Sequence, residues 1–307
     1  MTAYISHPGC LLHEMDPEHP ECPARLHAID DRLKAAGIMD YLRHYDAPRA
    51  EVAHLARAHT MRHVQEIIAV APGSGLVRVD PDTSMNPHSL EAALRAAGAL
   101  VLATDLVIEG RHRNAFCNVR PPGHHAERDR AMGFCLFNNV AVGVAHALDE
   151  HELRRVAIVD FDVHHGNGTE DIFRDDPRVL ICQTFQHPLY PYTGADSIPG
   201  HVINCPLPGG SGSREFRAAV SGAWLPELER FQPEMIFISA GFDAHREDPL
   251  AHLNLVEDDY AWVTREVMSV AARHASGRVV STLEGGYALS ALGRSATAHI
   301  RALLGLW

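Results

Sequence analysis

Two aspartates and a histidine follow a short apolar run near the middle of the chain. The segment reads Val156-Ala-Ile-Val-Asp160-Phe-Asp162-Val-His164, and its four apolar residues predict a strand. Alternate side chains of a strand share a face, so Asp160, Asp162 and His164 are expected to point the same way. Two carboxylates and an imidazole on a buried strand repel and desolvate one another unless a cation lies between them. The segment therefore predicts a metal site, with a solvated loop of aspartate and histidine as the alternative.

Three further apolar runs also end in polar side chains. They are Asn114–Val119, followed by His124 and His125, Met235–Ala240, followed by Asp243, and Val279–Leu283, followed by Tyr287. Three protein ligands and a water are typical of catalytic zinc, because the open position is where water is activated. Two carboxylate ligands make the ion less acidic, so the site also needs a base for the water and a donor for the substrate carbonyl. As alternatives, Asp243 suits a helix N-cap and the two histidines suit a loop.

The order of apolar and amphipathic segments predicts the elements that position these residues. Runs that are apolar at every position are typical of a parallel sheet covered on both faces, whose polar strand ends meet at one edge. Besides the four runs above, we expect strands over Ala3–His7 and Val179–Phe185. We expect a polar loop over Val77–Pro87 and helices over Arg25–Ala36, Thr60–Ala69, Ser89–Glu109, Asn138–Leu148, Ser213–Leu228, Val256–Ala275 and Leu289–Leu304.

Length and composition restrict the class of protein. A chain of 307 residues without linker, repeat or low-complexity tract fits one large α/β domain over residues 1–307. The formal charge of −12, with no basic run, argues against a nucleic-acid partner. The apolar segments are too short for a bilayer, and the N-terminus lacks a basic stretch followed by an apolar one, so we expect a cytoplasmic protein without a membrane partner. The six cysteines are scattered, and no disulfide is expected.

Five motifs resemble, in order, those of the zinc-dependent histone deacetylases and their bacterial relatives, the deacetylase-like amidohydrolases and acetylpolyamine amidohydrolases. The motifs are Arg120-Pro-Pro-Gly-His-His-Ala126, Gly133-Phe-Cys-Leu-Phe-Asn-Asn139, Asp160-Phe-Asp-Val-His-His-Gly-Asn-Gly168, Gly241-Phe-Asp-Ala-His-Arg-Glu-Asp-Pro249 and Leu283-Glu-Gly-Gly-Tyr287. The resemblance covers almost the whole chain, and Asn167 with Leu-Glu-Gly-Gly is similar to the class II branch. It implies the arginase/deacetylase fold, an α/β domain with a central parallel sheet.

The resemblance also implies a metal centre and a mechanism. Asp162, His164 and Asp243 match the zinc ligands of the family, with Fe²⁺ or Co²⁺ as alternative ions. In the implied reaction zinc-bound water attacks an acetyl carbonyl. Tyr287 polarises that carbonyl, and His125 is the general base and then the general acid.

The histidine pair has partners that the resemblance implies. His124 matches an electrostatic companion of His125 and is expected to bond to Asp160. Asn167 matches the residue that orients His125. Several relatives carry an aspartate where Asn167 stands, so the pKa of His125 is expected to differ from theirs.

Substrate contacts and a second ion are implied as well. Phe134 and Tyr190 match paired aromatics that wall a narrow tunnel around a methylene chain, although aromatic residues also fill cores. Further matches are Gly133 for a contact through its carbonyl, Asp82 for a rim aspartate that holds the substrate backbone, Arg25 for an arginine behind the zinc, and Leu250 at the tunnel entrance. A monovalent-cation site is matched by Asp160, Asp162, His164, Thr184 and Phe185, so structural K⁺ is expected.

We therefore expect hydrolysis of N-acetylated amines. Leu250 follows Asp248-Pro249, where relatives specialised for polyamines carry glutamate, so acetyl-lysine in a peptide or protein is favoured over an acetylated polyamine or another small amide. An arginase-like ureohydrolase with two manganese ions needs a second aspartate where His245 stands. A non-catalytic binding module would lack a ligand or the tyrosine, and neither is missing. The sequence leaves a homo-oligomer open.

Overall fold

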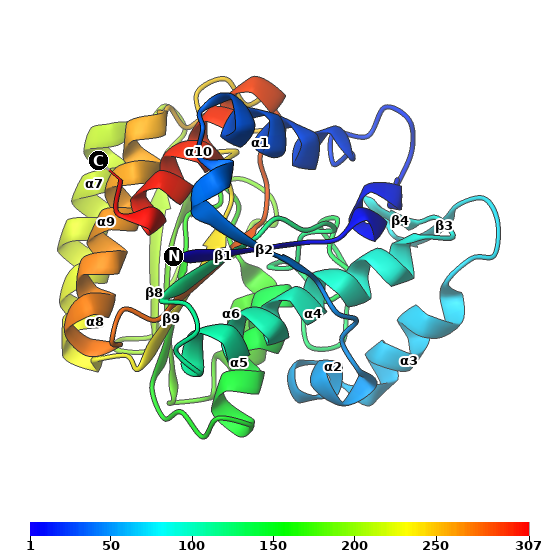
Figure 1. Cartoon of the computed structure of the whole chain (residues 1–307), viewed down its shortest axis with the longest axis horizontal. Helices are drawn as coiled ribbons and strands as arrows, with labels where there is room; N and C mark the ends of the chain where they lie inside the picture. Colours follow the sequence, from blue (N-terminus) through cyan, green and yellow to red (C-terminus); the bar gives the residue numbers. More distant parts are fainter. Residues whose placement is uncertain (307) are drawn as a thin grey trace.

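An eight-stranded parallel sheet forms the centre of the computed structural model, which describes residues 1–306 (Figure 1). The strand order is β2-β1-β5-β10-β9-β6-β7-β8. The strands are β1 Thr2–Ser6, β2 Leu42–Asp46, β5 Asn114–Cys117, β6 Val156–Asp160, β7 Val179–Gln186, β8 Val202–Leu207, β9 Met235–Ala240 and β10 Val279–Leu283. A separate hairpin pairs β3 Val77–Asp80 with β4 Thr83–Met85.

The path of the chain through the sheet brings four strands together. After β5 the chain moves past two positions to β6 and continues to the edge at β8, and β9 and β10 later fill the two positions. The neighbouring strands β6, β9 and β10 end at the same level of the sheet. Asp160 at the end of β6 pairs with Ser239 of β9, and Leu283 at the end of β10 pairs with Ala240 of β9. The loops after β5, β10, β9 and β6 therefore leave the same edge side by side, as expected of a site in an open α/β sheet.

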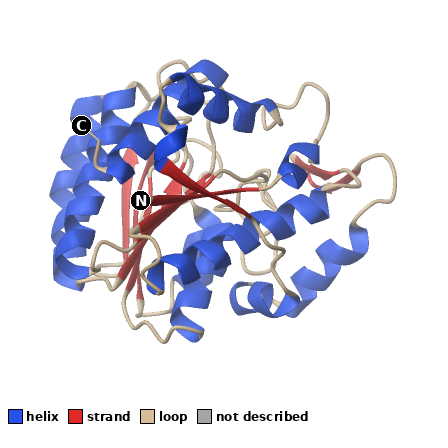
Figure 2. Cartoon of the chain, viewed as in Figure 1, coloured by secondary structure: helices blue, strands red, loops and turns tan. Residues whose placement is uncertain are grey.

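Helices cover both faces of the sheet (Figures 1 and 2). They are α1 Ala24–Ala35, α2 Val52–Ala58, α3 Met61–Val70, α4 Ser89–Ile108, α5 Asn139–Asp149, α6 Asn167–Phe173, α7 Ser213–Ala219, α8 Leu225–Phe231, α9 Glu257–His274 and α10 Leu289–Leu304. On one side α4 packs against α5, and on the other α10 packs between α1 and α9. Short 3₁₀ turns lie at Pro8–Leu12 and Met39–Tyr41, and a π turn at Val220–Trp224 joins α7 to α8.

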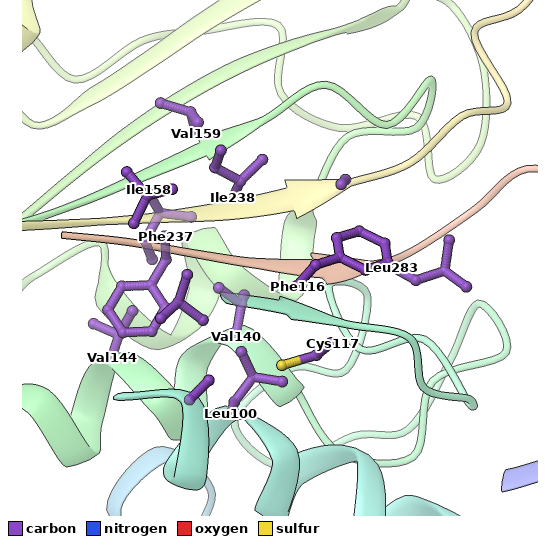
Figure 3. Close-up of a cluster of buried hydrophobic side chains, with 14 of the residues drawn as sticks. Leu100, Phe116, Cys117, Val140, Val144, Ile158, Val159, Phe237, Ile238 and Leu283 are labelled. Carbon is purple, nitrogen blue, oxygen red and sulfur yellow. The ribbon is translucent and has the colours of Figure 1, made fainter. Parts of the chain in front are cut away.

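The core between the sheet and the helices α4 and α5 is apolar and closely packed (Figure 3). Leu100 of α4 and Val140 of α5 lie beneath Phe116 and Phe237 of the sheet, and all four side chains are fully buried. Burying a side chain of this size contributes about 1.5–3 kcal/mol to folding. A Cβ at Gly143 would lie 3.0 Å from both Leu100 and Phe237, so a glycine lets α5 approach this closely.

Most predicted elements are confirmed to within two residues. The strands over Val156–Asp160, Met235–Ala240 and Val279–Leu283 and the helix over Leu289–Leu304 agree at both ends. The predicted helix over Ser213–Leu228 contains the π turn and continues to Phe231.

Three predictions were incomplete or wrong. The loop predicted over Val77–Pro87 is the hairpin of β3 and β4, whose short strands mix polar and apolar residues and lack the apolar runs of the sheet. Strands β2 and β8 were missed because they are the two edges of the sheet, and β8 even contains Pro206, which an edge strand tolerates. The short helices α2 and α6 were also missed.

Two further expectations concern the membrane and the cysteines. Within residues 1–306 no helix combines the length and the apolar character that a membrane span needs. All six cysteines are free, which confirms the expectation of no disulfide.

Candidate active site

Asp162, His164 and Asp243 converge where β6 and β9 end. The first two lie in the loop after β6 and the third in the loop after β9. The His164 Nδ1 atom lies 3.0 Å from an Asp162 oxygen and 3.3 Å from Asp243 Oδ2. One donor atom from each residue lies within 4.8 Å of the others, so the three can share one ion.

The prediction that Asp160 points the same way as Asp162 and His164 is wrong. Strand β6 ends at Asp160, so Asp162 and His164 lie in the loop and the alternation of a strand does not apply to them. Asp160 instead accepts the backbone N–H of Asp162 through Oδ1 and contacts His124 through Oδ2. The residues that converge on one point are Asp162, His164 and Asp243.

One buried carboxylate oxygen of this group accepts no hydrogen bond within the described chain, and its nearest positive group is the His164 ring. Asp243 Oδ1 accepts the backbone N–H of Val163 at 2.9 Å, and Asp162 Oδ2 accepts that of Gly285 at 2.8 Å. Asp243 Oδ2 is buried without a hydrogen bond. Burial and the charge of Asp162 raise the pKa of Asp243. Such an atom is costly unless a cation satisfies it.

The group also holds one positive charge at its centre. Burial disfavours the His164 imidazolium, but the carboxylates of Asp162 and Asp243 outweigh burial and raise the pKa of His164 to about 10. A divalent metal can take the place of that proton, since a ligating imidazole must be deprotonated. Two carboxylates and one imidazole are donors that suit Zn²⁺ and other first-row ions. These three residues therefore fit a metal ion.

Two glycines shape the space around the carboxylates. A Cβ at Gly285 would lie 2.0 Å from Asp243 Oδ2, and a Cβ at Gly241 would lie 2.0 Å from Asp162 Oδ2. Real side chains do not approach so closely, so any larger residue would displace the carboxylates.

His124 is buried beside two carboxylates. Its Nδ1 lies 2.9 Å from Asp160 Oδ2, as predicted, and its Nε2 lies 3.7 Å from Asp162. Burial disfavours the charged ring, but Asp162 and Asp160 outweigh it and raise the pKa of His124 well above its usual range. The two carboxylates therefore favour the charged form of His124, which suits it to supply charge rather than a basic nitrogen.

The pKa of His125 is shifted in the opposite direction from that of His124. Its Nδ1 lies 2.7 Å from Asn167 Oδ1. Burial, together with the positive charge of His124, holds the pKa of His125 well below its usual range. A neutral ring with Nδ1 bonded to Asn167 leaves Nε2 free to accept a proton.

A cavity of about 230 Å³ lies over this group. It is lined by Asp82, Pro122, His124, His125, Gly133, Phe134, His164, Leu189, Tyr190, Leu250, Gly285 and Tyr287. The Phe134 ring stands edge-on to Tyr287 at 6.0 Å between centroids, and the Tyr190 ring stands edge-on to His125 at 5.2 Å. Phe134 and Tyr190, the two aromatics predicted to wall a tunnel, thus line this cavity and do not fill the core.

The β3–β4 hairpin holds one side of the cavity. Asp82 Oδ1 accepts the backbone N–H of Gly133 at 3.1 Å, and the Thr83 hydroxyl accepts that of Phe134 at 2.9 Å. Gly133 and Phe134 both have positive φ, and a Cβ at Gly133 would lie 2.4 Å from the His125 ring. Asp82 therefore lines the cavity and fixes the turn that presents Phe134, and its contact with the substrate backbone stays a prediction.

Arg25 lies directly behind Tyr287. Its guanidinium is fully buried, stands 4.9 Å from the centre of the Tyr287 ring and donates to the Gly286 carbonyl at 2.7 Å. Glu21 accepts from Arg25 at 3.0 Å and also pairs with the buried Arg120. Sequence reasoning predicted Arg25 but missed the carboxylate that balances the two arginines.

Thr184 and Phe185 lie on β7, next to the end of β6. Both are buried, and the Thr184 hydroxyl has no hydrogen-bond partner within the described chain. Asp160 pairs with Gln183 in the sheet, so Thr184 and Phe185 lie beside the end of β6, and Asp162 and His164 follow in the loop after it.

Two buried carboxylates were part of quoted motifs but received no role. Asp248 accepts the backbone N–H groups of Tyr287 at 2.7 Å, Ala288 at 3.2 Å and Leu250 at 3.1 Å. Glu284 accepts the N–H groups of Gly123 and His124, and burial raises the pKa of Glu284 to about 7. The signal for Glu284 was an acidic residue in an otherwise apolar and glycine-rich motif, whereas Asp248 stands among other charged residues and had no such signal.

A second group of metal-ligand types lies outside the cavity. The Nε2 atoms of His146 and His151 both lie 2.7 Å from Asp105 Oδ1. Arg57 can only donate, and its Nη1 lies 2.9 Å from His146 Nδ1, so His146 Nε2 carries the proton and donates to Asp105. This group is a hydrogen-bond network between α4, α5 and α2.

Comparison with known proteins agrees with this geometry. The family model of the histone deacetylase domain matches residues 19–303. The chain is similar to the histone deacetylase-like amidohydrolase of Pseudomonas aeruginosa, at 37% identity over 93% of this chain and 81% of that protein. It is similar to a probable deacetylase of Archaeoglobus fulgidus, at 36% identity over 94% and 82%.

A solved structure shares the whole fold. The crystal structure of the HDA15 HD domain superimposes with a TM-score of 0.93 at 36% sequence identity and covers 99% of this chain and 90% of that one. With the family model matched over most of its length, the chain belongs to the histone deacetylase family.

Proposed function

We propose that the protein is a metal-dependent deacetylase that hydrolyses N-acetylated amines, with acetyl-lysine in peptides or proteins as its substrate class. The observation that carries this proposal is the convergence of Asp162, His164 and Asp243, whose buried Oδ2 accepts no hydrogen bond, under a cavity that His125 and Tyr287 line. Metal ligands, a neutral base and a phenol donor at one cavity are what amide hydrolysis requires.

Asp162, His164 and Asp243 would hold one Zn²⁺, with Fe²⁺ or Co²⁺ as alternatives. When bound, the ion would act as a Lewis acid and lower the pKa of a water molecule. We also propose K⁺ beside Asp160, Asp162, His164, Thr184 and Phe185, supported by the unpartnered Thr184 hydroxyl.

Residues of the chain would transfer the protons and stabilise the charge that develops during the reaction. His125 takes the proton of the attacking water on Nε2 and passes it to the leaving amine, because its low pKa keeps it neutral beforehand. The Tyr287 hydroxyl donates to the carbonyl oxygen as negative charge develops there. His124 stays charged and adds electrostatic stabilisation.

The chain offers few groups for a second metal, which disfavours an arginase-like reaction. His124 is occupied by Asp160, and His245, which stands where a second aspartate would be needed, lies against Glu257 at 3.6 Å. An arginase-like ureohydrolase would be indicated only if activity required two metal ions per chain.

The substrate class is tested by a ratio of kcat/KM on zinc-loaded protein, with an acetyl-lysine peptide against an N-acetylated polyamine. A ratio well above one is expected, because the rim residue Leu250 is apolar and offers no charge to a cationic polyamine. The variant Leu250→Glu should lower the ratio. A wild-type ratio well below one would assign the protein to small polyamine substrates.

A further inference from the structure

The amide of Asn167 meets three acceptors on its nitrogen side. Its Nδ2 lies 2.8 Å from Glu127 Oε1, 3.4 Å from the sulfur of Met132 and 3.5 Å from the His125 carbonyl oxygen. The Glu127 carboxylate is the nearest of these and the only one that carries a charge. Charge-assisted hydrogen bonds are about twice as strong as neutral ones, so Glu127 contributes most to the orientation of the amide.

The orientation of this amide determines which nitrogen of His125 carries the proton. With Nδ2 turned to Glu127, Asn167 presents Oδ1 to His125 Nδ1 at 2.7 Å. An amide oxygen can only accept, so Nδ1 of the neutral ring is protonated and Nε2 keeps its lone pair. The Nε2 lone pair is the one that a general base in this cavity uses.

The reversed amide would give the wrong tautomer. An asparagine can turn its amide over at little cost unless its neighbours distinguish oxygen from nitrogen. A reversed Asn167 would present its N–H groups to His125 Nδ1, which would then accept, and the ring proton would move to Nε2. In serine proteases a comparable change of tautomer costs about 10⁴ in kcat.

We propose that Glu127 is a positioning residue, which holds the His125 base in its active tautomer by fixing the amide of Asn167. The proposal rests on the proposed function, in which His125 is the base. Glu127 does not line the cavity, so it acts through Asn167 and not on the substrate.

The backbone around Glu127 supports this role. The Glu127 carbonyl accepts from His59 Nδ1 at 2.9 Å, and the Glu127 N–H donates to the Arg130 carbonyl at 2.9 Å. Asn167 is the first residue of α6, so its backbone is held by the helix. The side chains of Glu127 and Asn167 thus meet from two anchored segments.

The test uses three zinc-loaded variants and an acetyl-lysine peptide. Glu127→Ala should lower kcat by about 10- to 100-fold, as loss of a supporting partner commonly does, with KM nearly unchanged. Asp129→Ala is the matched control, because Asp129 lies in the same loop but pairs with Arg62, and it should keep wild-type kcat.

Rescue distinguishes positioning from simple structural support. An aspartate at position 167 has two oxygens and no wrong orientation, so Glu127→Ala with Asn167→Asp should recover at least about tenfold of the lost kcat. If Glu127 only stabilised the loop, the second substitution would restore nothing. Wild-type kcat in Glu127→Ala, or an equal loss in Asp129→Ala, would also overturn the proposal.

Nitrogen-15 NMR of the histidines gives a reading that does not depend on turnover. The His125 signal, identified by its loss in His125→Ala, should report Nδ1–H in the wild type and a share of Nε2–H in Glu127→Ala. An unchanged tautomer would refute the proposal. If the wild-type protein releases no acetate, the proposed function fails, and the tautomer of His125 alone decides the role of Glu127.

Discussion

Three side chains at the base of the cavity differ from the other polar groups around them. Asp243 has a buried oxygen that accepts no hydrogen bond, the pKa of His125 is held well below its usual range, and Tyr287 lines the cavity. Asp160 and His124 are bonded to each other, and Asn167 is bonded to Nδ1 of His125, which leaves Nε2 of that ring free. Chemistry at this site is therefore expected to depend on the first three, and each can be tested by removing one atom or one charge.

Tyr287→Phe removes only the hydroxyl. We expect kcat on an acetyl-lysine peptide to fall by about 100- to 1,000-fold, or about 2.7–4 kcal/mol, as for other oxyanion donors. Zinc content should stay at the wild-type level, since Tyr287 is not among the ligands. Steady-state kinetics with metal analysis measures both, and unchanged turnover would remove Tyr287 from the mechanism.

Asp243→Asn replaces the unpartnered oxygen or its neighbour by an N–H donor. A donor facing the His164–Asp162 pair cannot bind a cation, so the variant should lose zinc on dialysis while the wild type keeps it. Asp105→Asn is the control, because Asp105 already accepts from two histidines. Full zinc in dialysed Asp243→Asn would exclude Asp243 as a ligand.

At the level of elements, the site is built from the loops after four neighbouring strands, and hydrogen bonds between these loops fix their positions. Asp248 joins two of these loops, since it follows β9 in the chain and accepts from the backbone of Tyr287 and Ala288 after β10. It also accepts from Leu250 at the cavity rim. Burial and the charge of Asp243 raise the pKa of Asp248 to about 6.

Asp248→Ala should therefore affect both stability and turnover. Each of the three backbone N–H groups that stays buried without this acceptor costs about 1–3 kcal/mol of unfolding free energy. The loss of a fixed position for Tyr287 should lower kcat more than it raises KM. Asp248→Asn keeps one acceptor oxygen and should lie between the wild type and the alanine variant. Thermal unfolding and kinetics would contradict this role if Asp248→Ala kept wild-type kcat.

At the level of the whole molecule, the central strands and their motifs were predictable because they carry strong signals. A run such as Val156–Val159 is apolar throughout since both faces of the sheet are covered. The edge strands β2 and β8 and the β3–β4 hairpin were not predictable, because their short sequences mix apolar residues with polar ones or with proline.

The site residues were predictable as motifs, but their contacts were not. Asp160 and Asp162 lie two residues apart and both contact His124, yet only Asp162 joins the group with His164 and Asp243, because the strand ends between the two aspartates. The roles of Asp248, Glu284 and Glu127 depend on loops that meet only in the folded sheet. Spacing along the chain does not contain that information.

Buried neutral histidines should make the fold sensitive to acid. Burial lowers the pKa of His299 to about 3, and burial with the nearby His63 lowers that of His59 to about 3. The folded values lie below the unfolded value of about 6.5. Above pH 6.5 these histidines therefore do not lower the free energy of unfolding. As pH falls from 6.5 toward 3, the free energy of unfolding decreases by up to about 1.4 kcal/mol per pH unit for each histidine.

His299→Gln removes one of these titrations. Below pH 6 the unfolding free energy of the variant should fall less steeply than that of the wild type, by about 1.4 kcal/mol per pH unit. His27→Gln, at an exposed position, controls for the loss of a histidine as such. Denaturant unfolding at several pH values measures the slopes, and parallel slopes for His299→Gln and wild type would contradict the prediction.

The most direct test of a one-metal deacetylase is a titration of metal-free protein with zinc while acetate release from an acetyl-lysine peptide is followed. Activity should rise linearly and reach its plateau at one zinc per chain, because Asp162, His164 and Asp243 form a single group of ligands at the cavity. A plateau at two metal ions per chain, or no acetate release at any zinc level, would contradict the proposed function.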